Sequence, residues 1–143
     1  MSDQFGPKRP LGVTIVAALA IVSGAFDVLG GIVLFILGSD AETVEAFGGS
    51  ALLATAAIAA IAIGVIMVII AFGLLRGNAV SRLAATVVQA VSLVMSTWFA
   101  IVEPSTLGTE IPSALLALAI LVLLWSGEAT RYFRGLAPNE PTS

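Results

Sequence analysis

Four long apolar stretches take up most of this 143-residue chain, at residues 11–37, 51–75, 79–102 and 111–125. A hydrocarbon core about 30 Å thick is crossed by about 20 apolar residues of helix, because each residue adds about 1.5 Å. The first three stretches exceed that length, and the fourth reaches it when its helix continues to residue 134. None shows the two-residue alternation of a barrel strand, so the sequence predicts four transmembrane helices.

The composition excludes a water-soluble globule and most enzyme classes. Apolar residues make up 59% of the chain and charged residues 10%, against about 45–50% and about 25% in a typical soluble domain. The chain has no histidine and no cysteine, which removes the commonest general base, the usual zinc sites and thiol nucleophiles. We therefore expect no enzyme, no cofactor and no metal. No basic patch of the size used for nucleic acids exists, so no nucleic-acid partner is expected either.

The basic residues predict the orientation in the membrane. They precede the first stretch, flank the turn between the second and third, or follow the fourth: Lys8, Arg9, Arg76, Arg82, Arg131 and Arg134. The connections 38–50 and 103–110 carry only acidic charges. Since lysine and arginine concentrate on the cytoplasmic side, we expect an all-α integral membrane four-helix bundle of the cell membrane with both termini cytoplasmic. The apolar run continues about seventeen residues past Ala20, longer than a signal-peptide core, so no cleavage is expected.

This topology divides the chain into three parts. Residues 1–10 and 135–143 are expected as cytoplasmic tails. Residues 11–134 are expected as the transmembrane domain, with helices at about 11–37, 51–75, 79–102 and 111–134.

The connections carry helix start and stop signals. Gly77 between Arg76 and Asn78 predicts a tight turn in which the glycine takes a left-handed conformation and the asparagine caps the next helix. Ser39 and Glu42 fit a capping box, and the glycines at 48–49 supply a stop, which together predict a short acidic helix. Pro112 is expected in the first turn of the last helix.

Aromatic residues gather near the two predicted membrane boundaries. One group is Phe35, Trp98 and Phe99, and the other is Phe72, Trp125, Tyr132 and Phe133. Aromatic side chains are enriched at membrane–water interfaces, so we expect these residues to anchor the protein in the interface rather than to line a ligand site.

Small residues recur at helical spacing in the first two stretches. They are Ala20, Gly24, Gly30 and Gly31 in the first stretch, and Ala56, Ala60 and Gly64 in the second. Helices in lipid associate through close backbone approach and polar contacts, because lipid tails are as apolar as leucine. These residues are the predicted helix-packing positions.

Asp27 is a carboxylate near the middle of the first predicted helix. A charge at this depth is costly, by about 2.5–3.5 kcal/mol on insertion scales, and such residues generally face the interior of a bundle. Gln89, Ser92 and Ser96 form a polar stripe on the third helix, and we predict that Asp27 contacts Ser92 or Gln89. Two interpretations stay open: a proton- or cation-binding group in a transport path, or a polar contact that fixes helix packing or meets a partner subunit.

Three short segments carry a family resemblance. They are Arg9-Pro10-Leu11-Gly12, Gly73-Leu74-Leu75-Arg76-Gly77 followed by Arg82, and Arg131-Tyr132-Phe133. Together they resemble a group of uncharacterised four-span membrane proteins of bacteria and archaea. Relatives in this group often carry an aromatic residue just before the arginine that opens the third helix, where this chain has Val80-Ser81. The resemblance implies a four-helix membrane bundle, no established activity and no catalytic residues.

The leading hypothesis for function is a structural or accessory membrane subunit. Little of the chain is expected outside the bilayer, so its main resource is helix surface, with which it would pack against itself or against other membrane subunits. One alternative is a small oligomeric channel or transporter that uses Asp27 with Gln89, Ser92 and Ser96. A further alternative is a membrane sensor or regulator that receives a signal through the acidic connections.

Overall fold

The structure is a computed structural model that describes residues 8–102, 104–137 and 141, apart from the side chains of residues 99, 106 and 109. Most of the two predicted tails, the predicted interfacial side chain of Phe99 and the acidic Glu103 lie outside the described residues. All regular secondary structure in the described part is helical.

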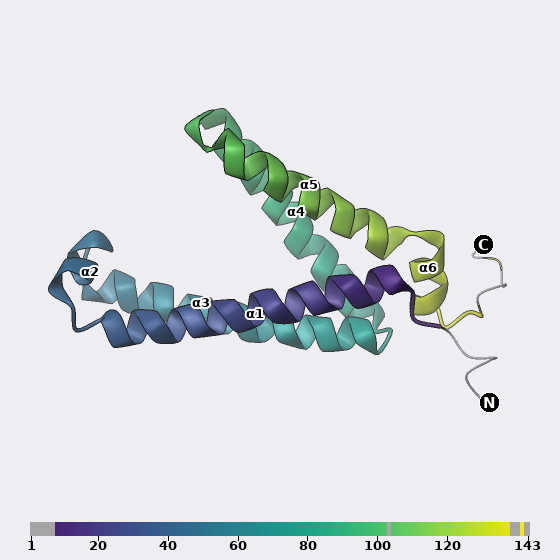
Figure 1. Cartoon of the computed structure of the whole chain (residues 1–143). Helices are drawn as coiled ribbons and strands as arrows, with labels where there is room; N and C mark the ends of the chain where they lie inside the picture. Colours follow the sequence, from purple (N-terminus) through teal and green to yellow (C-terminus); the bar gives the residue numbers. More distant parts are fainter. Residues whose placement is uncertain (1–7, 103, 138–140, 142–143) are drawn as a thin grey trace. The chain divides into compact units, whose positions relative to one another are not determined.

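Six α-helices and one 3₁₀ helix follow one another along the described residues, in the arrangement drawn in Figure 1. They are α1 (Leu11–Leu37), α2 (Ala41–Ala46), α3 (Ser50–Leu75), α4 (Ala79–Val102), the 3₁₀ helix η2 (Pro104–Thr106), α5 (Leu107–Trp125) and α6 (Gly127–Phe133). By length and composition, α1, α3 and α4 can each cross a membrane. A fourth crossing is present if α5 and α6 are counted as one bent span. The all-helical fold predicted from the sequence is therefore confirmed, with three or four helices that could span a membrane.

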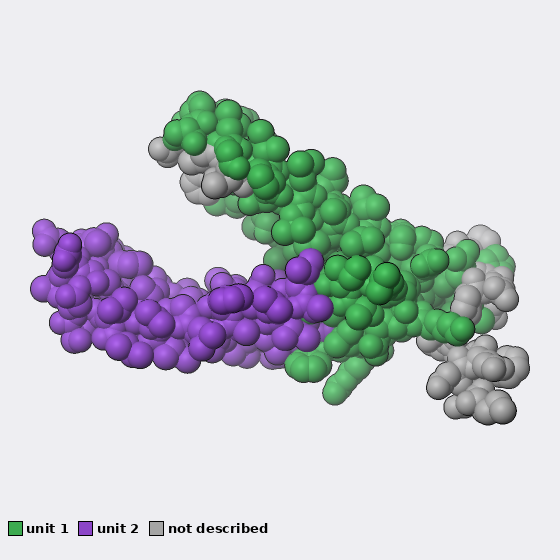
Figure 2. Space-filling model, viewed as in Figure 1, with its two compact units in different colours: residues 1–17, 72–143 green, residues 18–71 purple. Residues whose placement is uncertain are grey.

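The chain divides into two compact units, residues 18–71 and residues 1–17 with 72–143 (Figure 2). The division passes through α1 and through α3. Each unit is described by itself below.

In the unit 18–71, α1 and α3 run antiparallel with their backbones close together. A Cβ atom placed on Gly24 would lie 2.6 Å from the carbonyl oxygen of Gly64. One placed on Gly31 would lie 2.7 Å from the carbonyl oxygen of Ala57. Both distances are too short for a side chain, so glycine at these positions permits the helices to approach at backbone distance, as membrane helix pairs do.

The predicted packing positions differ in how deeply they are buried within this unit. Ala20, Gly24, Gly31 and Gly64 are buried, Ala56 and Ala60 are half-buried, and Gly30 is exposed with nothing within 4 Å of a Cβ placed on it. The fully buried alanine of α3 is instead Ala57. The contact follows seven-residue steps, from 24 to 31 and from 57 to 64, because a seven-residue step returns a helix to nearly the same side.

The connection between α1 and α3 contains the predicted acidic helix, α2, with a different cap. Asp40, not Ser39, is the N-cap: its carboxylate accepts hydrogen bonds from the backbone N–H of Thr43 at 2.9 Å and from the Thr43 hydroxyl at 2.6 Å. These bonds stabilise the charged form and hold the pKa of Asp40 below its usual value. Gly48 and Gly49 end the helix with φ of 81° and 124°, as the sequence predicted.

In the second unit, α4 and α5 pack side by side and antiparallel, with η2 between them (Figure 1). The turn that precedes α4 has the predicted geometry. Gly77 has φ of 73°, and the side-chain oxygen of Asn78 accepts a hydrogen bond from the N–H of Val80 at 2.8 Å. A Cβ on Gly73 would collide with the side chain of Ser81, so this turn depends on two glycines.

The fourth predicted helix differs from the expectation of one helix over 111–134. It begins earlier, at Leu107, and it is broken after Trp125, where α6 departs at 58°. The break occurs because Ser126 leaves helical geometry and caps α6, its hydroxyl accepting from the N–H of Ala129 at 3.3 Å. Pro112 consequently lies inside α5 rather than in its first turn.

The glycine contact in the unit 18–71 generates a prediction with an adjacent control. Replacing Gly31 with alanine should lower the free energy of unfolding by about 1–3 kcal/mol, because the added methyl group overpacks against Ala57 and Ile61. Unfolding by denaturing detergent in mixed micelles, followed by circular dichroism, measures the change.

The same substitution at Gly30 adds its methyl group to open space. It should leave the free energy of unfolding unchanged or raise it by up to about 1 kcal/mol, since alanine favours helix. Equal destabilisation by both substitutions would contradict the packing described here.

Candidate functional site

A buried arginine organises the second unit. Arg82, in the first turn of α4, is 8% exposed. Its Nε donates a hydrogen bond to the carbonyl oxygen of Leu124 at 2.9 Å, and its Nη2 donates to the hydroxyl of Thr130 at 2.9 Å. The guanidinium also lies 3.8 Å from the ring centre of Trp125. Arg82 thus binds the end of α5 and the middle of α6 at once.

No carboxylate of the described residues forms an ion pair with Arg82. The charge is instead surrounded by oxygen dipoles and aromatic faces, with the Phe133 ring centre 5.2 Å away in addition to Trp125. Ring faces attract a cation electrostatically, and the attraction strengthens where water is excluded. We call Arg82, Trp125, Thr130 and Phe133 the arginine cage.

Thr86 joins the cage to α4 itself. Its hydroxyl donates to the carbonyl oxygen of Arg82 at 2.8 Å and accepts a hydrogen bond from the indole N–H of Trp125 at 2.9 Å. Trp125 is therefore fixed in orientation by a polar bond at one edge while Arg82 covers its face. The indole is held as a wall of the cage, even though about half of its surface is exposed.

Arg82 and Tyr132 donate hydrogen bonds to carbonyl groups at the ends of two helices. The last four carbonyl groups of an α-helix have no partner within the helix. Arg82 donates to one such group at Leu124, near the end of α5, and the Tyr132 hydroxyl donates to Leu75, the last residue of α3, at 2.6 Å. Tyr132 also covers Gly77, where a Cβ would lie 3.3 Å from its ring. The cluster therefore fastens α6 to the ends of two other helices.

The three segments on which the family resemblance rests converge in this unit. Tyr132 contacts Gly77 and bonds to Leu75, and Phe133 faces Arg82. The first segment joins them because Arg9 and Leu11 line one pocket with Arg131 and Tyr132. Residues far apart in the sequence thus meet at one end of the α4–α5 pair.

Two of the four aromatic residues expected at this boundary are buried instead of exposed. Tyr132 and Phe133 were expected as interfacial anchors, but both are buried, at 8% exposure, and their rings contact each other edge to face at 5.2 Å. The reason is the bend at Ser126, which turns α6 so that Ala129, Tyr132 and Phe133 form its buried face. Phe72 and Trp125 remain exposed.

Asp27 lies on the unit 18–71, beside the close glycine contact. It is half-buried and sits between Gly24 and Gly31 along α1, rotated about 60° from Gly24 and about 40° from Gly31 by the helical repeat. Its carboxylate makes no hydrogen bond or ion pair with a described residue of its own unit. It is the sole charged residue of α1 and α3.

The polar stripe of α4 belongs to the other unit, and its members have different surroundings. Ser96 is buried, Gln89 is half-buried and Ser92 is exposed. Ser96 lines a depression of about 310 Å³ with Glu110 and Ala114 of α5. The contact of Asp27 with Ser92 or Gln89 stays a prediction.

The described residues contain no group of three or more acidic side chains placed to hold a metal ion. The chain has no histidine or cysteine that could add a ligand.

Comparison of the sequence with protein-family models and with curated proteins, and of the fold with solved structures, found no match.

The sequence placed Arg82 at a helix end as an orientation signal but missed its role in the cage. A signal was present: Arg82 falls inside an apolar stretch and has no acidic residue three or four positions away with which to pair. A cation within a span that lacks a local partner requires a distant one. Its actual partners lie 42 and 48 residues further along the chain.

The cage predicts that lysine cannot replace Arg82. An ammonium group cannot donate to Leu124 and Thr130 from two separated nitrogens while lying flat on Trp125. Arg82→Lys should lower the free energy of unfolding by about 1–3 kcal/mol, because a buried acceptor loses its donor. The same detergent titration measures the loss.

Arg76→Lys is the matched control, since Arg76 is exposed. It should change the free energy of unfolding by less than about 0.5 kcal/mol. If the two lysine variants unfold alike, the cage does not stabilise the protein.

Proposed function

We propose that the protein crosses the cell membrane four times with both termini in the cytoplasm. All six basic residues support this orientation under the positive-inside rule. The apolar part of α5, residues 111–125, rises only about 22 Å, short of a hydrocarbon core about 30 Å thick. The fourth crossing is therefore formed by α5 and α6 together as one bent span, with α6 at the boundary as part of the arginine cage.

The absence of cysteine makes the orientation directly testable. Ala46, in α2, and Ala79, at the start of α4, are both exposed and would lie on opposite sides. A membrane-impermeant maleimide added to intact cells should label Ala46→Cys and should label Ala79→Cys only after the membrane is permeabilised. Labelling of both variants from the same side would contradict the topology.

Within the membrane, the proposed role is that of a non-catalytic structural or accessory subunit that associates through helix faces with itself or with other membrane proteins. The observation that carries this proposal is Asp27. About 24 Å of helix separates it from the start of α1 and about 15 Å from the end, so it lies deep in the span. A half-buried carboxylate at this depth, with no partner in its own unit, requires a polar group from elsewhere.

Helix association is favoured over transport because Asp27 stands alone. Ion and proton paths are built from series of ionisable groups, whereas α1 and α3 contain one. The backbone contact at Gly24 and Gly64 is already formed between α1 and α3, so a polar partner for Asp27 has to come from outside this helix pair.

Substitution of Asp27 separates assembly from transport. Asp27→Leu should weaken self-association in lipid nanodiscs, measured by native mass spectrometry or cross-linking, by about fivefold to thirtyfold in dissociation constant. Asp27→Asn should have a smaller effect, because an amide still forms hydrogen bonds. Both variants should retain the helical content of the unsubstituted protein.

Glu42→Gln is the matched control, since Glu42 is an exposed acidic residue of α2. It should leave association unchanged. Should Asp27→Asn assemble normally yet abolish a proton or cation flux measured in proteoliposomes, the channel alternative would replace the accessory role.

A further inference from the structure

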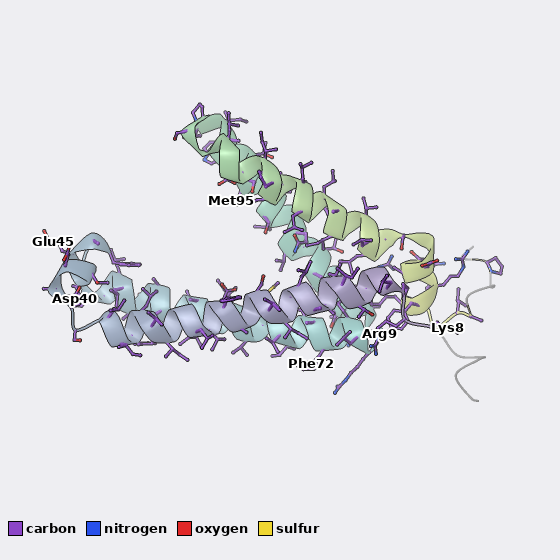
Figure 3. All side chains as sticks on the ribbon, viewed as in Figure 1. Lys8, Arg9, Asp40, Glu45, Phe72 and Met95 are labelled. Carbon is purple, nitrogen blue, oxygen red and sulfur yellow. The ribbon has the colours of Figure 1, made fainter. Side chains whose placement is uncertain are left out.

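A pocket lined by several charged residues lies where the start of α1 meets α6, within the unit formed by residues 1–17 and 72–143. One wall is the segment from Lys8 to Leu11, and the other is α6 and the turn after it; Figure 3 shows Lys8 and Arg9 at the end that carries α6. Its volume is about 320 Å³. The lining residues are Lys8, Arg9, Pro10, Leu11, Glu128, Arg131, Tyr132 and Leu136.

The described residues that line this pocket carry a net positive charge, although the chain as a whole has a net charge of −3. Three of its six basic residues, Lys8, Arg9 and Arg131, line the pocket, with one acidic residue, Glu128. Lysine and arginine together suit an anion that offers several oxygen atoms: arginine supplies paired donors in a plane, and lysine supplies a mobile point charge.

Both walls are held by contacts described above, so the pocket is a built feature of this unit. Gly12 permits the first turn of α1 to lie against α5, since a Cβ there would be 3.0 Å from the Leu123 side chain. The neighbouring Val13 is fully buried. On the other side, Thr130 bonds to Arg82 and Tyr132 bonds to Leu75, and these bonds hold α6 in place. Arg131 lies between Thr130 and Tyr132 in the sequence, so its backbone is held as well.

The rim of the pocket is apolar where α1 begins. Leu11 is 74% exposed and is followed by a helix whose outer face carries further exposed apolar side chains, Ile15 and Leu19 among them. A ligand in this pocket therefore meets cations at one end and a membrane-spanning apolar surface at the other. Free phosphate matches the first of these features, and a phospholipid matches both.

We infer that this pocket binds the phosphate group of an anionic phospholipid at the membrane boundary, with the acyl chains along the apolar surface that begins at Leu11. Arg131 and Lys8 hold the phosphate oxygens, and the net positive charge selects anionic over zwitterionic headgroups. The inference rests on the membrane location proposed above and is independent of the role of Asp27.

The test uses the full chain purified in a mild detergent. Short-chain phosphatidylglycerol, short-chain phosphatidylcholine and inorganic phosphate are titrated separately, and binding is followed by native mass spectrometry and by the shift in melting temperature. One phosphatidylglycerol molecule should bind, at least fivefold more tightly than phosphatidylcholine. Lys8→Gln and Arg131→Gln should each weaken that binding by about fivefold, the effect of one charge near an anionic headgroup.

Glu128→Gln is the control that separates a loss of binding from a loss of folding. Removal of the one negative charge among the described lining residues should tighten phosphatidylglycerol binding by up to about fivefold, a gain that damage to the fold cannot produce. Arg76→Gln removes a cation that does not line the pocket and should change binding by less than twofold. Asp27→Leu should leave it unchanged, which separates this inference from the proposed assembly role.

Two results would overturn the inference. Equal binding of phosphatidylcholine and phosphatidylglycerol would show that the cations do not select the ligand. Binding of inorganic phosphate as tight as that of phosphatidylglycerol would assign the pocket to a soluble phosphate compound instead of a lipid.

Discussion

Two apolar helices gain little by leaving lipid to touch each other, because the acyl chains they leave are as apolar as the side chains they meet. Every contact that holds a membrane fold together must therefore come from tighter packing or from polar bonds. Each unit of this protein illustrates one of these two means. In residues 18–71, α1 and α3 approach at backbone distance through Gly24, Gly31 and Gly64. In the other unit, Arg82 and Tyr132 bond to carbonyl groups at helix ends.

The arginine cage shows how a cation can be buried without a carboxylate. An ion pair needs a second desolvated charge, and the cost of removing two charges from water can exceed their attraction. Arg82 instead meets groups that the fold already has to satisfy, since the carbonyl groups at the end of α5 lack partners within the helix. One side chain thereby gives a buried charge its hydrogen-bond acceptor and gives an unpaired carbonyl group at a helix end its donor. Tyr132 likewise donates to the last carbonyl group of α3.

The sequence predicted the long helices and the turns well because those features have local causes. Long apolar runs, Gly77 and the acidic α2 each act over a few residues. The packed side of α3 was harder to identify: the stripe through Ala56 and Ala60 was expected, and Ala57 is the buried residue. A helix that is apolar all round carries no pattern that tells which side packs.

The arginine cage lay beyond sequence reasoning for a different reason. A backbone carbonyl is present at every residue and has no signature in the sequence, so nothing singled out Leu124 or Leu75 as acceptors. The bend at Ser126 was equally hidden, since a single serine is a weak cap signal within an apolar run. Without that bend, Tyr132 and Phe133 would continue along α5 and would face the predicted membrane interface.

The distance along the chain between Arg82 and Thr130 has a consequence for biosynthesis. Arg82 leaves the ribosome 48 residues before Thr130, when α5 and α6 do not yet exist. During that interval its charge has no partners from the cage and must stay hydrated. Synthesis of α6 is then the event that withdraws Arg82 from water, so this helix closes the unit.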